Sequence, residues 1–248
     1  MIHRLVCILG AVLLCTATLS AQKDPEAVAV DDDAAAGLDL TAVSEVFRDS
    51  KDLEDFEKRL NDPDAGVNNL DLDRNGEVDF LRVVEQGSDD TRLVILQAVL
   101  GENEFQDVAT IEVEKTDTDQ YNMQVRGNEE LYGPNYYIVP AVHVHLFPVV
   151  TWMYRPLWRP YVSVWRVGVY PRWWRPWRPV GVTVYRTRTV HLTTRASFTV
   201  SRTSRVTTVH KVHYTPHRST MVRSRTTVTK SPGGKVTVRK STTTRRRR

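Results

Sequence analysis

Residues 71–79 are the stretch of this chain whose residue types and spacing specify a chemistry: Asp-Leu-Asp-Arg-Asn-Gly-Glu-Val-Asp. Oxygen-bearing side chains alternate with other residues, and Gly76 stands where a sharp turn through positive φ favours a residue without a Cβ atom. This order matches the first nine positions of an EF-hand calcium loop, and Ca²⁺ takes about 6–8 oxygen ligands. The pattern assigns five donors, namely the side chains of Asp71, Asp73, Asn75 and Asp79 and the backbone carbonyl of Glu77.

The match to a full EF-hand ends after these nine residues. Position 12 of the loop normally carries a bidentate Glu, and here it is Arg82, a cation that repels Ca²⁺ unless its side chain points away. Asp62, Asp64 and Glu85 are candidates for a replacement ligand, and the sequence does not choose among them. Without the bidentate Glu we expect an isolated, weak site with a dissociation constant of about 10⁻⁴–10⁻³ M.

An alternative interpretation of the same residues is a plain β-turn. Asn75-Gly76 is a type I′ turn signal, and it lies between residues that alternate as two strands of a hairpin do. The hairpin would gather the aspartates on its polar face, where like charges oppose one another. Its alternating apolar residues are Leu70, Leu72, Val78 and Phe80.

Residues 1–21 have the features of a secretory signal peptide. His3 and Arg4 form a short basic start, an apolar run follows from residue 5 to residue 14, and small residues precede Gln22. The sequence therefore predicts an exported protein, which is periplasmic, associated with the outer envelope or extracellular. Both cysteines of the chain lie inside this segment, so the mature protein would have no thiol for a disulfide or a metal.

Charge divides the chain into two halves. Residues 22–130 contain all 30 acidic residues and 10 basic ones, which gives a net charge of −20, whereas residues 131–248 contain 23 basic residues and no acidic one. Such asymmetry predicts two modules with different partners, or halves that attract each other within one chain or between two. Charge-driven self-association is one form of the second alternative.

The acidic half predicts an α+β domain over residues 39–130, after a flexible acidic leader over residues 22–38. Residues 39–61 carry apolar side chains at helical spacing, with Ser50 as a candidate cap between two short helices. Four strand-like runs follow the Asp-rich loop and are separated by turn compositions. We expect an antiparallel meander with the helices on one face. The runs are 78–85, 92–100, 108–115 and 121–126.

The basic half has two compositions. Residues 131–180 contain all six tryptophans and repeated Arg-Pro pairs, and residues 181–248 form a basic Thr/Ser/Arg-rich, low-complexity tail. The alternation around Val182 and Val184 predicts a strand, and a hairpin is predicted around Pro232-Gly233-Gly234. We expect weak order in the rest of the tail.

The partners of the basic half are also open. Arg beside Trp suits anionic lipid or an envelope polysaccharide. For residues 131–180 the alternatives are an arm wrapped around the acidic domain or a disordered linker. Nucleic acid is an unlikely partner, because the protein is predicted to be exported and carries no structured nucleic-acid motif.

The remaining motifs give no case for an enzyme. The sequence contains no zinc-protease, nucleophile-elbow, P-loop or dinucleotide-binding pattern. Two histidine groups are spaced as metal ligands sometimes are, but neither is supported by a cysteine or a nearby carboxylate. They are His143 with His145, and His210 with His213 and His217. We therefore expect a non-enzymatic protein.

With residues 68–85, 96–103 and 106–115 taken together, the chain resembles a group of secreted, largely uncharacterised bacterial proteins. These combine one EF-hand-like Asp loop with a short β domain and an aromatic, Arg/Pro-rich basic tail. The resemblance spans about residues 40–165 and is specific in residues 68–115. It implies export and a calcium-type loop at Asp71, Asp73, Asn75, Glu77 and Asp79, and it implies no reaction.

Overall fold

The computed structural model describes residues 35–244, except residues 89, 119, 221 and 231–235. The predicted signal peptide and most of the predicted leader lie outside the described residues. The description begins with the 3-10 helix η1 (Ala35–Gly37), and the next residue, Leu38, is completely buried. The end of the segment that we expected to be a flexible leader is therefore folded. Among the described helices, none is long and apolar enough to cross a membrane.

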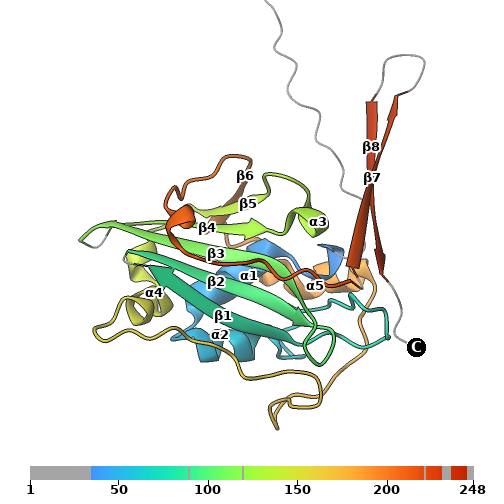
Figure 1. The fold of residues 1–248 in the computed structure, drawn as a ribbon, viewed down its shortest axis with the longest axis horizontal. Helices are drawn as coiled ribbons and strands as arrows, with labels where there is room; N and C mark the ends of the chain where they lie inside the picture. The colour runs from blue at the N-terminus through green and yellow to red at the C-terminus, as the bar shows by residue number, and fades with distance from the viewer. Residues whose placement is uncertain (1–34, 89, 119, 221, 231–235, 245–248) are drawn as a thin grey trace, which may run out of the picture.

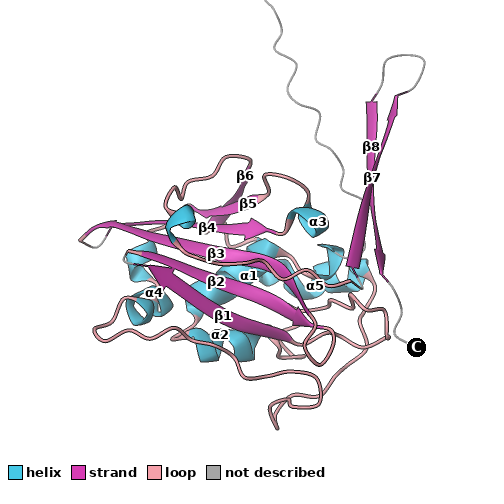
Figure 2. Cartoon of the chain, in the orientation of Figure 1, coloured by secondary structure: helices cyan, strands magenta, loops and turns pink. Residues whose placement is uncertain are grey.

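An antiparallel sheet of six strands forms the centre of the molecule (Figures 1 and 2). The strands lie in chain order from β1 at one edge to β6 at the other, and consecutive strands are paired. The predicted α+β class and the meander are confirmed. The strands are β1 (Leu81–Ser88), β2 (Thr91–Val99), β3 (Phe105–Asp117), β4 (Gln120–Gly127), β5 (Tyr137–Pro140) and β6 (Phe198–Ser201).

Two short helices pack on one face of this sheet, as predicted. They are α1 (Leu40–Asp49) and α2 (Leu53–Leu60), and their apolar faces meet through an edge-to-face contact between Phe47 and Phe56. The cap prediction was wrong: Asp52, not Ser50, accepts the N-terminal hydrogen bond of α2. Ser50 ends α1 instead, and its hydroxyl donates to the carbonyl of Val46.

The fold does not stop at the predicted boundary near Glu130. Strands β5 and β6 extend the sheet, with three helices around them, namely α3 (Glu129–Tyr132), α4 (Pro148–Met153) and α5 (Val182–Thr193). The predicted strand at Val182 and Val184 is the start of helix α5. That helix contacts α1 and buries Tyr185, Thr189 and Leu192, so tertiary contacts override a β-type pattern.

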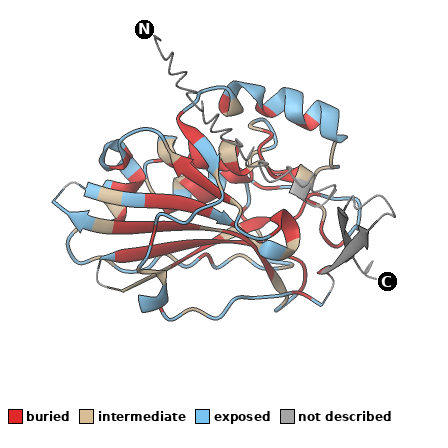
Figure 3. Cartoon of the chain, turned by 90° about the horizontal axis from the view of Figure 1, so that it is seen from above, coloured by how far each residue is buried: buried red, intermediate tan, exposed pale blue. Residues whose placement is uncertain are grey.

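The basic half also covers the second face of the sheet. Residues 202–220 run as irregular chain that includes the 3-10 helix η3 (Val209–Lys211), and the later part crosses in front of β2 and β3 (Figure 1). Val212 packs there against Leu93 and Ile95. The 3-10 helix η2 (Val144–Leu146) lies beside α4 and β4 instead. Because both faces are covered, the middle of every central strand is buried (Figure 3).

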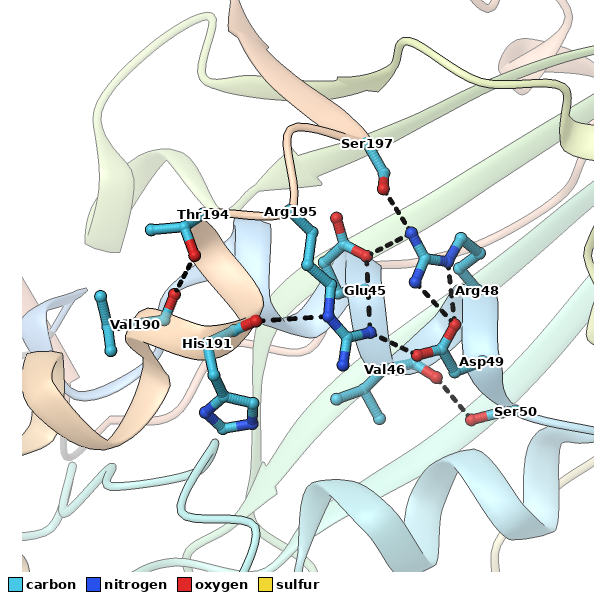
Figure 4. A network of polar contacts seen from close by, with 10 residues as sticks. All are labelled: Glu45, Val46, Arg48, Asp49, Ser50, Val190, His191, Thr194, Arg195 and Ser197. Atoms are coloured by element: carbon cyan, nitrogen blue, oxygen red, sulfur yellow. Dashed lines mark hydrogen bonds and ion pairs between the residues drawn. The ribbon is translucent and has the colours of Figure 1, made fainter.

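Salt bridges and hydrogen bonds tie the two halves together at α1. Arg195, which follows α5, lies 2.5 Å from Asp49, while Arg48 bridges the buried carboxylate of Glu45 at 2.6 Å and donates to Ser197 (Figure 4). The arginines therefore link α1 to the connection between α5 and β6. For residues 131–180, the wrapping-arm alternative describes the structure better than a disordered linker does.

The predicted hairpin near the C-terminus is present. Strand β7 (Val222–Lys230) pairs antiparallel with β8 (Val236–Thr244), separate from the main sheet (Figure 1). The Pro-Gly-Gly turn itself lies outside the described residues.

Candidate metal site

The Asp loop, residues 71–79, precedes β1 and brings three of the predicted ligands together. Asp71, Asp73 and Asp79 each place one carboxylate oxygen within 4.8 Å of the others. Two oxygens bound to one Ca²⁺ at about 2.3–2.6 Å are separated by at most about 5 Å. The spacing of these three carboxylates, the Asp cluster, therefore fits a shared cation.

Backbone N–H groups fix the orientation of each carboxylate. Gly76 donates to Asp71 Oδ2 at 3.0 Å, and its φ of 88° explains the glycine at this position. Asn75 donates to Asp73 Oδ1 at 3.0 Å, and Leu72 donates to Asp79 Oδ2 at 2.6 Å. These bonds occupy one oxygen of Asp71 and one of Asp79 and leave the other for a ligand, whereas the second oxygen of Asp73 accepts from the side chain of Asn75.

One atom of the cluster lacks a partner. Within the described part of the chain, Asp71 Oδ1 is buried and accepts no hydrogen bond. A buried carboxylate oxygen without a donor is costly, and a bound ion is one of the explanations for an unsatisfied group of this kind.

Burial and mutual repulsion make the cluster unfavourable when it is fully charged. Asp79 is 5% exposed, and burial raises the pKa of its carboxyl well above the ordinary value, with the charges of Asp73 and Asp71 adding to the effect. The pKa of Asp73 is also raised, first by burial and then by Asp71, against the hydrogen bond from Asn75. A cation bound among the three would relieve both causes.

The other two predicted donors are placed differently. The Asn75 side chain donates from Nδ2 to Asp73 Oδ2 at 3.1 Å and accepts at Oδ1 from Glu77 N–H at 2.7 Å, so a ligand role requires its amide to rotate. The Glu77 side chain is exposed, as expected for a position that contributes only its backbone carbonyl.

Arg82 does not obstruct the site, because its side chain is engaged elsewhere. Its Nε donates to Gln97 Oε1 at 2.8 Å, and its guanidinium stacks 3.4 Å from the centre of the Phe105 ring. Of the replacement ligands considered, Glu85 accepts from Trp158 and Tyr161 instead, and Asp62 accepts from the backbone of Asp64. Neither joins the Asp cluster.

The hairpin alternative differs from the structure. Residues 67–80, all of which are described, contain no strand, and positive φ occurs there at Arg74 and Gly76 but not at Asn75. A type I′ turn needs positive φ at both central residues. The apolar residues that seemed to alternate are all buried, namely Leu70, Leu72, Val78 and Phe80.

Residues that the sequence analysis missed hold the loop in place. Asn68 Nδ2 donates to the carbonyl of Asp79 at 2.8 Å, and Asn69 exchanges two hydrogen bonds with the backbone of Val180. The consecutive asparagines were the available signal, since Asn side chains often bond to nearby backbone. The contact with Val180 has no local signal.

The aromatic strap, residues 154–180, packs along the edge of β1 and against the loop. Trp158 Nε1 and Tyr161 N–H both donate to the carboxylate of Glu85 at 2.9 Å. Trp174 packs edge-to-face on Phe80, one residue beyond the loop, with ring centres 5.3 Å apart. Most of the tryptophans therefore serve packing, which was the alternative to a binding role.

The histidine groups do not form metal sites with acidic residues. His143 and His145 lie with ring centres 5.6 Å apart, and His217 contacts Gln97 and Tyr214 in a polar network around Asp107. Among the described residues, the Asp cluster is the group of acidic, histidine or cysteine side chains spaced to hold a metal.

Comparisons of the chain with protein-family models, with curated proteins and with solved structures find no match. The argument for function therefore comes from the residues and their geometry.

Proposed function

We propose that this is an exported, non-enzymatic calcium-binding protein whose Asp loop holds one Ca²⁺. The observation that carries the proposal is the convergence of Asp71, Asp73 and Asp79 within 4.8 Å, with Asp71 Oδ1 buried and unpartnered among the described residues. The predicted signal peptide supports export.

The donor set favours calcium over other divalent cations. All candidate ligands are oxygens, which suit hard cations, and the described cluster offers neither sulfur nor imidazole. Mg²⁺ demands near-ideal octahedral geometry at about 2.0–2.1 Å, whereas Ca²⁺ accepts irregular sites. A loop whose backbone N–H groups are bonded to its own carboxylates has little freedom to close around the smaller ion.

The position of the loop gives the ion a structural role. The loop lies between α2 and β1, and the strap contacts Val78 at the end of the loop and Phe80 just beyond it. Bound Ca²⁺ would neutralise the cluster and hold together a loop that is otherwise opposed by three like charges. The protein would gain stability from the ion by mass action.

The test is thermal and chemical unfolding of the full, chelator-treated chain with 10 mM CaCl₂ or MgCl₂. For a dissociation constant of about 10⁻⁴–10⁻³ M, 10 mM Ca²⁺ should stabilise the protein by about 1.4–2.7 kcal/mol. The double variant Asp71→Asn with Asp73→Asn should lose this gain, because the amides keep the shape but not the charge.

The matched control is Asp62→Asn with Asp64→Asn, which removes two charges from the same region outside the cluster. It should keep the full calcium effect. An absence of any Ca²⁺ effect on the wild-type chain, or an equal loss in both double variants, would overturn the proposal.

A further inference from the structure

The aromatic strap has two chemically different faces. Its aromatic side chains turn mainly toward the protein: Trp174 is 4% exposed, and Trp158 and Tyr161 bond to Glu85. Large aliphatic side chains point outward instead. The exposed apolar residues of the strap are Leu157, Val162, Val164, Val169 and Trp173.

Leu157 is exposed to solvent between two residues whose side chains are hydrogen-bonded to the sheet. It is 97% exposed and has a φ of 57°, a left-handed conformation that is unfavourable for a leucine. The chain is anchored on both sides, by the Tyr154 hydroxyl on the carbonyl of Asp90 at 2.7 Å and by Trp158 on Glu85. Strain at an exposed apolar tip between two anchors points to a role outside the folding of the chain.

Val162 and Val164 belong to the same outward face. The backbone bonds of Tyr161 and Ser163 pair this segment with the free edge of β1, and the side chain of Ser163 is buried between the two exposed valines. Alternation along an extended segment places both valines on the same side. Their position is therefore fixed by the sheet edge.

Exposed cationic residues alternate with these apolar residues along the sequence of the strap. Arg159, Arg166, Arg172, Arg175 and Arg178 are exposed. The salt bridges recorded in the described part of the chain involve other arginines, and residues 131–248 contain no acidic residue. The charge of the strap therefore remains available to an anionic partner.

We propose that the outward face of the strap docks on an anionic lipid surface. Aliphatic side chains enter the boundary between head groups and acyl chains, while arginines contact lipid phosphates. A polysaccharide is disfavoured because sugar rings stack on exposed aromatic faces, and here the aromatic rings are largely occupied by packing. This inference is independent of the calcium proposal, because none of these residues belongs to the Asp loop.

The test is sedimentation of the full chain with vesicles of phosphatidylcholine alone or with 30% phosphatidylglycerol. The strap variant carries Leu157→Ser, Val162→Ser and Val164→Ser. The control variant carries Val184→Ser, Val190→Ser and Val200→Ser, which are similarly exposed on α5 and β6. The wild type and the control should bind the anionic vesicles, and the strap variant should partition at least tenfold less.

Three results would overturn the proposal. Failure of the wild-type chain to bind anionic vesicles excludes lipid docking. Equal binding of both variants means that arginines adsorb without insertion. Retention on an anionic polysaccharide column without binding to vesicles identifies a sugar polymer as the partner. Thermal unfolding of each variant verifies that the serines leave the fold intact.

Discussion

Val78 donates its backbone N–H to the carbonyl oxygen of Trp177 at 2.8 Å, which joins the end of the Asp loop to the aromatic strap. The next residue but one, Phe80, packs on Trp174. Two segments almost a hundred residues apart in the sequence thus form one unit beside β1. Substitutions that disturb the packing of the strap should therefore also disturb the Asp loop.

Trp174 is the central side chain of this unit, with its ring centre 4.5 Å from that of Tyr170. Trp174→Ala should destabilise the protein by about 3–5 kcal/mol, because it leaves a cavity among packed aromatic rings. Trp174→Phe should cost clearly less, since the indole N–H has no hydrogen-bond partner in the described residues. Urea unfolding measures both.

The neighbouring tryptophan supplies the control for this prediction. Trp173 is 45% exposed and lies 5.9 Å from the Lys58 ammonium. Trp173→Ala should cost at most about 1 kcal/mol. Equal costs for the two alanine variants would mean that the strap is not packed as described.

Alanine substitutions at two glycines distinguish the cost of backbone strain from an effect on calcium binding. Gly76 has φ 88° and Gly168 has φ 80°, and a Cβ atom added to either would meet open space. Gly76→Ala and Gly168→Ala should therefore each cost about 1–2 kcal/mol through the left-handed conformation alone. Under the calcium proposal, only Gly76→Ala should also weaken Ca²⁺ binding in calorimetric titration. Equal calcium affinities in the two variants would argue against a site in the Asp loop.

The sequence predicts those parts of the fold that depend on local patterns. Residues 92–100 and 108–115 alternate or run apolar over strand lengths, and the structure places β2 and β3 there. The first strand begins three residues later than predicted, because the N–H groups of Val78 and Asp79 bond to Trp177 and Leu70 rather than to β2.

The candidate site also has one part that local sequence predicts and another that depends on tertiary contacts. Short-range spacing is sufficient to bring Asp71, Asp73 and Asp79 together, because a turn at Gly76 folds nine residues back on themselves. The direction of Arg82 was not predictable, since it depends on Gln97 and Phe105 in other strands. The contacts of Val180 and Trp177 are likewise tertiary, and no local pattern encodes them.

Arg48 and Arg195 both approach the same acidic residues but should differ in importance. Arg48 bridges Glu45, whose side chain is 1% exposed, whereas Arg195 mainly contacts the half-exposed Asp49. Arg48→Ala should cost about 3 kcal/mol, because it leaves the buried carboxylate of Glu45 with only the more distant Arg195, at 3.9 Å. Arg195→Ala should cost less than about 1 kcal/mol, as surface ion pairs do. Urea unfolding at low salt compares them, and a larger loss from Arg195→Ala would contradict this assignment.

Glu57 should make the stability of the protein depend on pH. Its carboxylate is 2% exposed and accepts from Val83 N–H at 2.6 Å, and the hydroxyl of Tyr161 in the strap lies 3.3 Å away. Burial raises the pKa of Glu57 to about 7 from an ordinary value of 4.5, although the hydrogen bonds from Val83, Ser163 and Tyr161 oppose the shift.

A raised pKa means that the folded chain holds a proton that the unfolded chain has released. The contribution of Glu57 to the free energy of unfolding is therefore fully present below about pH 4.5. As the pH rises to about 7, this contribution is lost progressively, and the free energy of unfolding falls by about 3 kcal/mol in total. Glu57→Gln keeps an acceptor for Val83 but cannot ionise, so its free energy of unfolding should lack this decline. Urea unfolding of both proteins between pH 4.5 and 8 in chelator measures the difference. Parallel curves for wild type and variant would show that Glu57 titrates normally and that the strap does not seal it from water.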